Sequence, residues 1–202
     1  MFIAFEGLDG CGKSTQLELL FNYLKSLNKK VIKVREPGGT EVGEKIRSIL
    51  LNKDLNINDR AELLLFLASR AQLVEEIIKP ALKCGYYVLA DRFADSSIAY
   101  QGGARNLGIE TVDFLNKFAT NNIFPDLVFF IDISVELALK RLNMKNKDRL
   151  EKEGRSFLEK VRKSYMEIAK TKSNFIIING ERNVNEIFSD IKRTIDNHII
   201  SK

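Results

Sequence analysis

The chain has 202 residues, 45% of them hydrophobic and 29% charged, with 32 Lys and Arg against 27 Asp and Glu for a formal net charge of +5. This composition suits one folded domain with a full core, and the small charge excess, without a basic and aromatic stripe, gives no reason to expect a nucleic-acid partner. With two cysteines, one histidine and no apolar run of the roughly 20 residues that a membrane helix needs, the sequence argues against a disulfide framework, histidine-based catalysis and a membrane partner, and we expect a cytoplasmic protein.

Short apolar runs alternate along the chain with longer segments of 3.6-residue periodicity. The expected strands are Phe2–Glu6, Lys30–Arg35, Tyr86–Ala90, Leu127–Asp132 and Asn174–Ile178. The expected helices are Ser14–Leu27, one after Gly39, Asn58–Leu82 with Asn58 as its cap, Glu110–Thr120, Ser156–Lys170 and Val184–Ile200. The first run has no basic segment before it and ends on a carboxylate, so we do not expect a signal peptide.

Most of the apolar runs are continuous rather than alternating, which is typical of strands covered on both faces. The order of strands and helices predicts an α/β fold with a parallel five-stranded sheet flanked by helices. Because no linker, repeat or low-complexity tract divides the sequence, we expect a single domain over residues 1–202. A polar, charged insert at about 142–155 interrupts the pattern, and by itself it reads as a solvated connector.

The residues after the first strand form a phosphate-binding motif. The segment Gly7-Leu8-Asp9-Gly10-Cys11-Gly12-Lys13-Ser14 matches G-x-x-x-x-G-K-[ST] directly before a helix. Glycines let the backbone curl so that its N–H groups point inward, and the positive end of the helix adds to their field. Lys13 is expected to reach the β- and γ-phosphates and the Ser14 hydroxyl to hold Mg²⁺, which predicts a nucleoside-triphosphate site of the P-loop type.

A magnesium site of this kind also needs a carboxylate at the end of a second buried strand. Asp91 directly follows the third predicted strand and is itself followed by Arg92, whereas Asp132 ends the fourth with no basic residue after it. Asp91 is therefore the better metal candidate, and Asp132 is its rival.

Further motifs narrow the class of protein. The Asn-Lys-x-Asp signature that reads guanine is missing from the sequence, which argues against a GTPase, and the length suits a small kinase. Phe66 and Arg70 are spaced i, i+4 and share a helix face, so they could stack on a planar base and donate to its exocyclic oxygen. Taken alone, Phe66 is better explained as a core residue, but Arg70 has no reason to accompany a core face, and the pair therefore favours a ligand site.

At these residues the sequence closely resembles the thymidylate kinase family, the bacterial-type P-loop nucleoside monophosphate kinases that convert dTMP to dTDP with ATP in dTTP biosynthesis. The resemblance covers nearly the whole chain, and its segments are highly specific in their order and spacing. They are Phe5–Thr15, Arg35–Thr40, Leu67–Arg70, Asp91–Arg92 with Ser96–Ser97 and Ala99–Gly102, Pro125–Leu127, Asp148-Arg149-x-Glu151, and Phe157 with Val161-Arg162 and Tyr165.

The resemblance implies a donor side on which Gly7 to Thr15 hold the phosphates of ATP, with Mg²⁺ on Ser14 and Asp91. It also implies that the charged insert at about 142–155 is a mobile lid over ATP. Arg141 and Arg149 would act from this side, with Lys145 and Lys147 as further candidates for the closing cation. A homodimer is the assembly that the family implies.

The resemblance also implies an acceptor side that binds dTMP. Arg92 would bind its phosphate, Phe66 would stack on thymine, and Arg70 would donate to a thymine carbonyl. Tyr100 would pack near C2′, where a ribose hydroxyl would collide. The rest of the expected set lines the acceptor phosphate, the base edge or the pocket rim: Asp9, Arg35, Glu36, Pro37, Arg47, Ser96, Ser97 and Gln101.

The expected catalytic residues are Asp9, Lys13, Asp91, Arg92 and Arg149. No general base is needed, because a phosphate monoester with a second pKa near about 6 is already mostly anionic at neutral pH. A deoxynucleoside kinase is the nearest alternative, and it would need Glu36 or Asp91 as a base for a 5′-hydroxyl. A non-catalytic ATP-binding protein is the other. Phe93 departs from the family pattern, which usually has Tyr after the Asp-Arg pair, and Cys11 stands where the family often has Ala.

Overall fold

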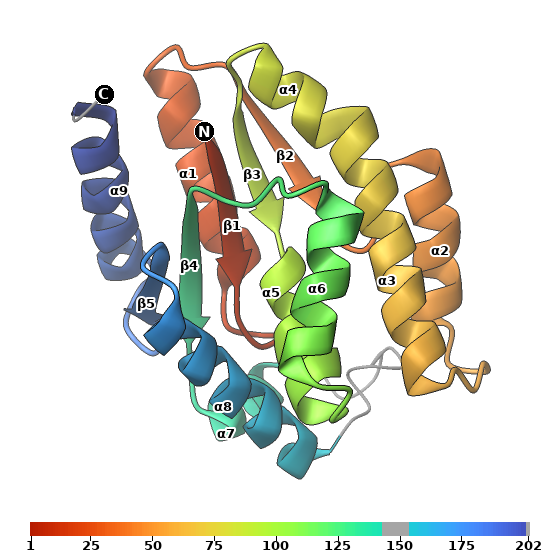
Figure 1. Ribbon diagram of the computed structural model, residues 1–202. Coiled ribbons are helices and arrows are strands. Elements are labelled where there is room, and N and C mark those ends of the chain that lie inside the picture. The colour runs from red at the N-terminus through yellow and green to blue at the C-terminus, as the bar shows by residue number, and fades with distance from the viewer. Residues whose placement is uncertain (143–153, 201–202) are drawn as a thin grey trace.

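The computed structural model describes residues 1–142 and 154–200 of the chain (Figure 1). Five strands form one sheet in the order β2-β3-β1-β4-β5, and every pair of neighbours is parallel. This confirms the predicted α/β fold, and each predicted strand lies within one residue of an observed one. The strands are β1 (Phe2–Glu6), β2 (Val31–Arg35), β3 (Tyr87–Asp91), β4 (Leu127–Asp132) and β5 (Phe175–Asn179).

The expectation that the strands are covered on both faces holds for the centre of the sheet only. All residues of β1 are buried, as are the first five of β4. The edge strands differ: Lys33 and Arg35 of β2 are exposed, and Ile177 of β5 is 46% exposed. An edge strand has one neighbour rather than two and lies at the margin of the helical layers, so its outer side chains reach solvent.

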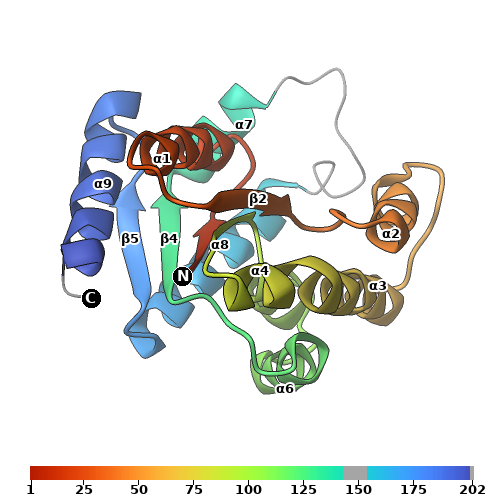
Figure 2. The same cartoon turned by 90° about the horizontal axis from the view of Figure 1, so that it is seen from above.

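Helices cover both faces of the sheet. Viewed from above, α1 lies on one side of the sheet, and α3, α4 and α6 lie on the other (Figure 2). Helix α9 packs against α1, and α2 packs against α3. The helical elements are α1 (Lys13–Ser26), α2 (Glu41–Leu51), α3 (Asp59–Leu73), the π-helix η1 (Val74–Ile78), α4 (Lys79–Lys83), α5 (Ala94–Ser97), the π-helix η2 (Ile98–Ala104), α6 (Ile109–Thr120), α7 (Val135–Arg141), α8 (Arg155–Thr171) and α9 (Val184–Ile200).

The segment predicted as one helix from Asn58 to Leu82 is divided. Asn58 caps its start as expected, with its side-chain oxygen accepting from the Arg60 N–H at 3.0 Å. The wider π-turn η1 then separates α3 from α4 just before Pro80. Proline has no N–H to donate to the carbonyl four residues earlier, and a π-turn is one way for a helix to accommodate that gap.

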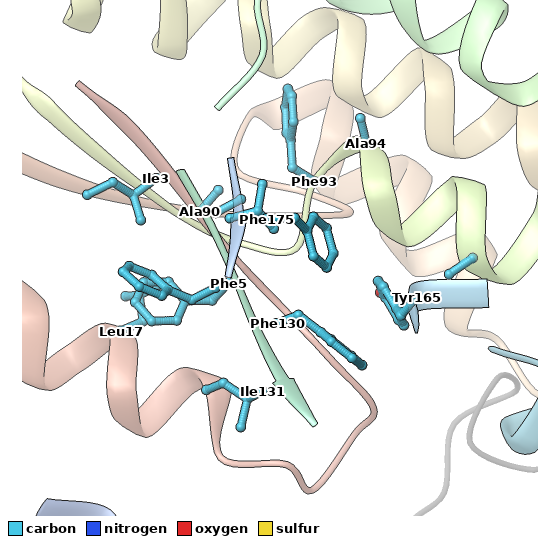
Figure 3. Close-up of a cluster of buried hydrophobic side chains, with 14 of the residues drawn as sticks. Ile3, Phe5, Leu17, Ala90, Phe93, Ala94, Phe130, Ile131, Tyr165 and Phe175 are labelled. Atoms are coloured by element: carbon cyan, nitrogen blue, oxygen red, sulfur yellow. The ribbon is translucent and has the colours of Figure 1, made fainter. Parts of the chain in front are cut away.

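Aromatic side chains fill the core between the sheet and α8. Tyr165 of α8 stacks on Phe130 of β4, with ring centroids 4.9 Å apart, and Phe130 also contacts Phe175 of β5 (Figure 3). Helix α8 also packs very closely on η2, as a Cβ added to Gly103 would overlap the Ser164 Oγ. This packing fixes η2, which carries Tyr100 and Gln101.

Among the described helices, none is long and apolar enough to cross a membrane.

Candidate active site

The loop between β1 and α1 has the curled backbone that its glycines predict. Gly7, Gly10 and Gly12 have φ values of 145°, 81° and 95°, which side chains rarely adopt. Gly7 also leaves no room for one, since an added Cβ would lie 2.7 Å from the Ile131 carbonyl and 2.8 Å from the Cys11 Sγ. The loop ends at the N-terminus of α1, where unpaired N–H groups and the helix dipole attract a phosphate.

Two cations meet at one carboxylate oxygen beside this loop. The Oδ1 of Asp9 accepts from the Lys13 Nζ at 2.9 Å and from the Arg92 Nη2 at 2.7 Å. Burial alone would raise the pKa of Asp9, but the charges of Arg92 and then Lys13 hold it well below its usual range. The structure therefore brings the cation of the phosphate loop next to a cation that follows β3.

Arg92 is held in place from several sides. Its φ of 70° is uncommon outside glycine, and such backbone strain is often found at functional sites. Its Nη1 lies 3.1 Å from the Ser96 Oγ and 3.4 Å from the Tyr165 hydroxyl, and its guanidinium carbon lies 5.2 Å from the centroid of the Tyr100 ring. These contacts fix the direction in which the guanidinium points.

Glu6 lies buried behind Arg92, and no role for it was predicted from the sequence. Its carboxylate accepts from the Phe93 N–H at 2.8 Å, the Ser96 hydroxyl at 2.6 Å and the Tyr165 hydroxyl at 2.8 Å. Burial raises the pKa of Glu6 to about 7, with Asp95 adding to the rise, while Arg92 and the two hydroxyls oppose it. The sequence feature that could have indicated a role for Glu6 is a carboxylate at the end of a buried apolar strand.

The expected metal ligands Ser14 and Asp91 lie together, with the Ser14 Oγ donating to the Asp91 Oδ2 at 2.6 Å. The rival Asp132 is instead held by two hydrogen bonds from Arg162, at 2.6 and 2.7 Å. Paired hydroxyl and carboxylate oxygens suit Mg²⁺, which usually takes one or two protein carboxylates and completes its shell with phosphate and water. The described residues contain no cluster of three or more His, Cys, Asp or Glu that would hold a metal without such help.

A cavity of about 250 Å³ opens next to these groups. Phe66, Arg70 and Gln101 line it together with Arg92, so helix α3, the β3–α5 junction and η2 all contribute. Every residue predicted for the acceptor side lines this one cavity, and Leu51 is an addition that the sequence did not suggest. The full lining is Asp9, Lys13, Ser14, Arg35, Glu36, Pro37, Arg47, Leu51, Phe66, Arg70, Asp91, Arg92, Ser96, Ser97, Tyr100 and Gln101.

Arg70 is 1% exposed, and the protein already engages its guanidinium fully. Its donors reach both oxygens of Glu36, with the shortest distance 2.5 Å. They also reach the Ser97 Oγ at 3.1 Å, the Asn116 Oδ1 at 2.6 Å and the Phe93 carbonyl at 3.2 Å. Burial raises the pKa of Glu36, and Arg70 opposes that rise. Donation from Arg70 to a base carbonyl stays a prediction, and it would have to share one of these engaged N–H groups.

The expected rim residues are also paired. Arg35 is exposed and its Nη2 donates to both oxygens of Glu44, at 3.1 and 3.0 Å. The Arg47 Nη1 donates to the Pro37 carbonyl at 2.9 Å. Beside the phosphate loop, the Arg141 Nη1 donates to the Gly10 carbonyl at 3.2 Å.

Part of the expected donor side lies outside the described residues. This holds for Arg149, Lys145 and Lys147, and for most of the segment 142–155 that the resemblance implies to be a lid. Their roles stay predictions.

The phosphate loop ends beside the Ser14–Asp91 pair, and the Asp9 Oδ1 joins the loop lysine to Arg92 in the cavity. This arrangement places the chain in the class of P-loop phosphotransferases. Comparison with known proteins narrows this class. The family model described as thymidylate kinase matches residues 5–191. The chain therefore belongs to the thymidylate kinase family.

Individual relatives agree over the full length. The chain is 65% identical to a thymidylate kinase of Thermosipho africanus, over 100% of both chains. It is 67% identical to one of Thermosipho melanesiensis, over 97% of this chain and 98% of the relative, and 55% identical to one of Fervidobacterium nodosum, over 98% and 100%.

Proposed function

We propose that the chain transfers the γ-phosphoryl group of ATP to a phosphate oxygen of dTMP, and that the cavity beside Arg92 holds dTMP. Membership of the thymidylate kinase family gives the activity: the chain is an ATP-dependent phosphotransferase whose acceptor is a phosphate group. The observation that supports the placement of the two substrates is the Asp9 Oδ1, which accepts from both Lys13 and Arg92. The two cations it joins belong to the donor loop and to the acceptor cavity.

On the donor side, backbone N–H groups of Gly7 to Thr15 bind the ATP phosphates and Lys13 neutralises charge on the β- and γ-phosphates. Arg141 borders this loop from α7 through its bond to the Gly10 carbonyl. Ser14 and Asp91 would hold Mg²⁺, which when bound supplies further neutralisation of the triphosphate. Arg149 remains a candidate for the closing cation from the resemblance alone.

On the acceptor side, Arg92 binds the dTMP phosphate, with Arg35 near the rim, and Phe66 stacks on the thymine ring. Tyr100 occupies the space beside C2′ and disfavours ribose. A phosphate oxygen is already anionic at neutral pH, so positioning and charge neutralisation suffice for in-line transfer.

The alternatives are not favoured by the site. A deoxynucleoside kinase needs a free carboxylate base, but Glu36 is bound to Arg70, and Asp91 accepts from Ser14. The family match also argues against an ATP-binding protein without catalysis.

An assay of ADP release with MgATP tests the proposal across dTMP, dUMP, dCMP, thymidine and the ribose analogue of dTMP. We expect dTMP to be the best acceptor, thymidine to be inactive and the ribonucleotide to be poor. Arg92→Met should raise the KM for dTMP strongly. Arg60→Met, an exposed arginine at the start of α3, is the matched control and should leave turnover unchanged. Turnover of thymidine but not dTMP would refute the proposal.

We further propose a homodimer that forms through α6 and α3. Phe114 and Phe118 of α6 are 69% and 84% exposed and lie one turn apart, while Leu64 on the adjoining α3 is 58% exposed. Large apolar side chains exposed on two neighbouring helices support an interface on this part of the surface. Light scattering after size exclusion should give twice the 23.0 kDa chain mass, and Phe118→Ser should lower it toward the monomer.

The proposed setting is the cytoplasm, and the proposed organisation is one domain over residues 1–202. Both cysteines are free thiols, as is usual in a reducing compartment. The described residues share one sheet and one hydrophobic core, which supports the single domain. A single cooperative unfolding transition of the purified chain would test the domain organisation.

A further inference from the structure

A buried carboxylate lies behind the base end of the acceptor cavity. Glu62 precedes Phe66 by four residues and Arg70 by eight on α3, so the three side chains follow one another along one helix face. Phe66 and Arg70 line the cavity, whereas Glu62 is 0% exposed. Any effect of Glu62 on a bound nucleotide must therefore pass through a neighbouring side chain.

That neighbour is Gln101 of η2. The Gln101 Nε2 donates to the Glu62 Oε1 at 2.8 Å, and both side chains are buried. Arg105 contacts both oxygens of the same carboxylate, with its Nε 3.4 Å from the Glu62 Oε1 and its Nη2 3.4 Å from the Oε2. Arg105 is itself held by Asp59 at 3.3 Å and lies 4.7 Å from the centroid of the Phe157 ring. Glu62 is thus fixed between a guanidinium and an amide.

This contact decides which end of the Gln101 amide faces the cavity. The Glu62 carboxylate accepts from Arg105 and takes a further donor from Gln101, whose Nε2 lies 2.8 Å from the Glu62 Oε1, so the NH₂ group of the amide faces Glu62. The carbonyl oxygen of the amide then points the other way. No described residue donates a hydrogen bond to the Gln101 Oε1. In the described part of the chain, the side-chain polar atoms that are both fully buried and without a partner belong to Gln16 and Thr120. The Gln101 Oε1 is therefore not fully buried, and it is accessible from the cavity that Gln101 lines. Gln101 offers the cavity an acceptor.

We propose that Glu62 is a positioning residue that makes the acceptor site select pyrimidines with a hydrogen on ring nitrogen N3. Thymine and uracil can donate that hydrogen to the Gln101 Oε1. Cytosine has a lone pair at N3, which would face the amide oxygen acceptor to acceptor. The inference rests on the proposed function, because it concerns the base of the nucleotide that accepts the phosphoryl group.

Glu62, rather than Gln101 alone, supplies the selectivity. A glutamine amide that is free to rotate can accept from thymine in one orientation and donate to cytosine in the other. Holding its NH₂ group on a buried carboxylate removes the second orientation. A site that holds a polar group in a fixed orientation rejects a mismatched analogue far more strongly than an apolar pocket does, because the mismatched polar groups stay unpaired.

The test compares kcat/KM for dUMP and dCMP, which share hydrogen at C5, so that the methyl group of thymine plays no part. Wild-type protein should prefer dUMP. Glu62→Gln should lower the ratio of kcat/KM for dUMP to kcat/KM for dCMP at least about tenfold, mainly through KM. A glutamine at this position can donate as well as accept, so the Gln101 amide is free to rotate. Turnover of dTMP should persist, since Arg92, Lys13 and the phosphate loop are unchanged.

The surface of the same helical segment offers a matched control. The Glu76 Oε2 of η1 accepts from the Gln72 Nε2 at 2.8 Å, which reproduces the glutamine–glutamate bond at an exposed position. Glu76→Gln should leave the dUMP-to-dCMP ratio unchanged. Glu62→Asp is a second variant that keeps a carboxylate near Arg105 but withdraws it from Gln101, and it should lower the ratio as Glu62→Gln does.

Coupling through Gln101 is tested by Glu62→Gln in a Gln101→Met background, where we expect no further change in the ratio. A wild-type protein that uses dCMP as well as dUMP would overturn the inference without any variant. A ratio that stays within twofold of wild type in folded Glu62→Gln or Glu62→Asp protein would overturn it too. Failure of wild-type protein to phosphorylate dTMP would instead refute the proposed function.

Discussion

Replacing Glu6 by Gln is expected to remove a pH-dependent loss of stability. Burial raises the pKa of Glu6 from 4.5 to about 7. Between these two values the native chain keeps a proton that the unfolded chain has released, so the free energy of unfolding falls as the pH rises. At 1.36 kcal/mol for each pKa unit, the whole interval corresponds to about 3 kcal/mol. A glutamine in this place can still accept from the Phe93 N–H while its NH₂ group meets the hydroxyls of Ser96 and Tyr165.

Urea unfolding of both proteins from about pH 4.5 to about pH 8 measures the effect. Wild-type protein should lose about 3 kcal/mol more than Glu6→Gln over this interval. All other titrating groups contribute to both proteins, so the difference isolates Glu6. Glu41→Gln is the control, because Glu41 is 84% exposed in an ion pair with Lys45 and such pairs contribute little to stability. A constant difference between wild-type and Glu6→Gln protein across the interval would refute the reasoning.

Three further changes follow from the site. Arg70→Leu leaves the buried Glu36 carboxylate without its cation and should cost about 3–5 kcal/mol in urea unfolding, whereas a loss below about 1 kcal/mol would contradict the buried pair. Ser14→Ala should lower kcat and raise the Mg²⁺ concentration needed for half-maximal turnover, with the Kd of dTMP by calorimetry unchanged; an unaltered Mg²⁺ requirement would remove Ser14 from the metal site. Tyr165→Phe deletes the hydroxyl near Arg92 and should weaken dTMP binding by about 2- to 10-fold. In an Arg92→Lys background the same change should have no effect on dTMP binding. Equal losses in both backgrounds would show that the hydroxyl does not act through Arg92.

The strands could be predicted because their runs are short, apolar and bounded by turn residues. Their order could not, since pairing β1 between β3 and β4 depends on contacts between distant segments. The exposed positions of β2 and β5 were missed for the same reason, because a sequence does not say which strands form the edges. The apolar residues keep a helical spacing through the segment that contains η1, so the spacing did not indicate a break there. Pro80 was the one residue in the sequence that indicated it.

The residues of the site divide in a similar way. Residues that belong to sequence motifs, such as Lys13, Ser14 and Arg92, could be assigned a role from the residue types and their spacing in the sequence. Glu62 and Asn116 act through side chains that are distant in sequence, so their partners emerge only when α3, α6 and η2 are packed together. Glu62 nevertheless had a signal, since it lies one turn before Phe66 on the same face.

The most direct test of the substrate assignment is a crystal structure of the protein with dTMP and without ATP. The nucleotide phosphate should lie within hydrogen-bond distance of Arg92, and the thymine ring should lie flat against Phe66 with N3 toward the Gln101 Oε1. A phosphate bound instead in the loop from Gly7 to Ser14, or a thymine ring away from Phe66, would contradict the assignment of the two sites.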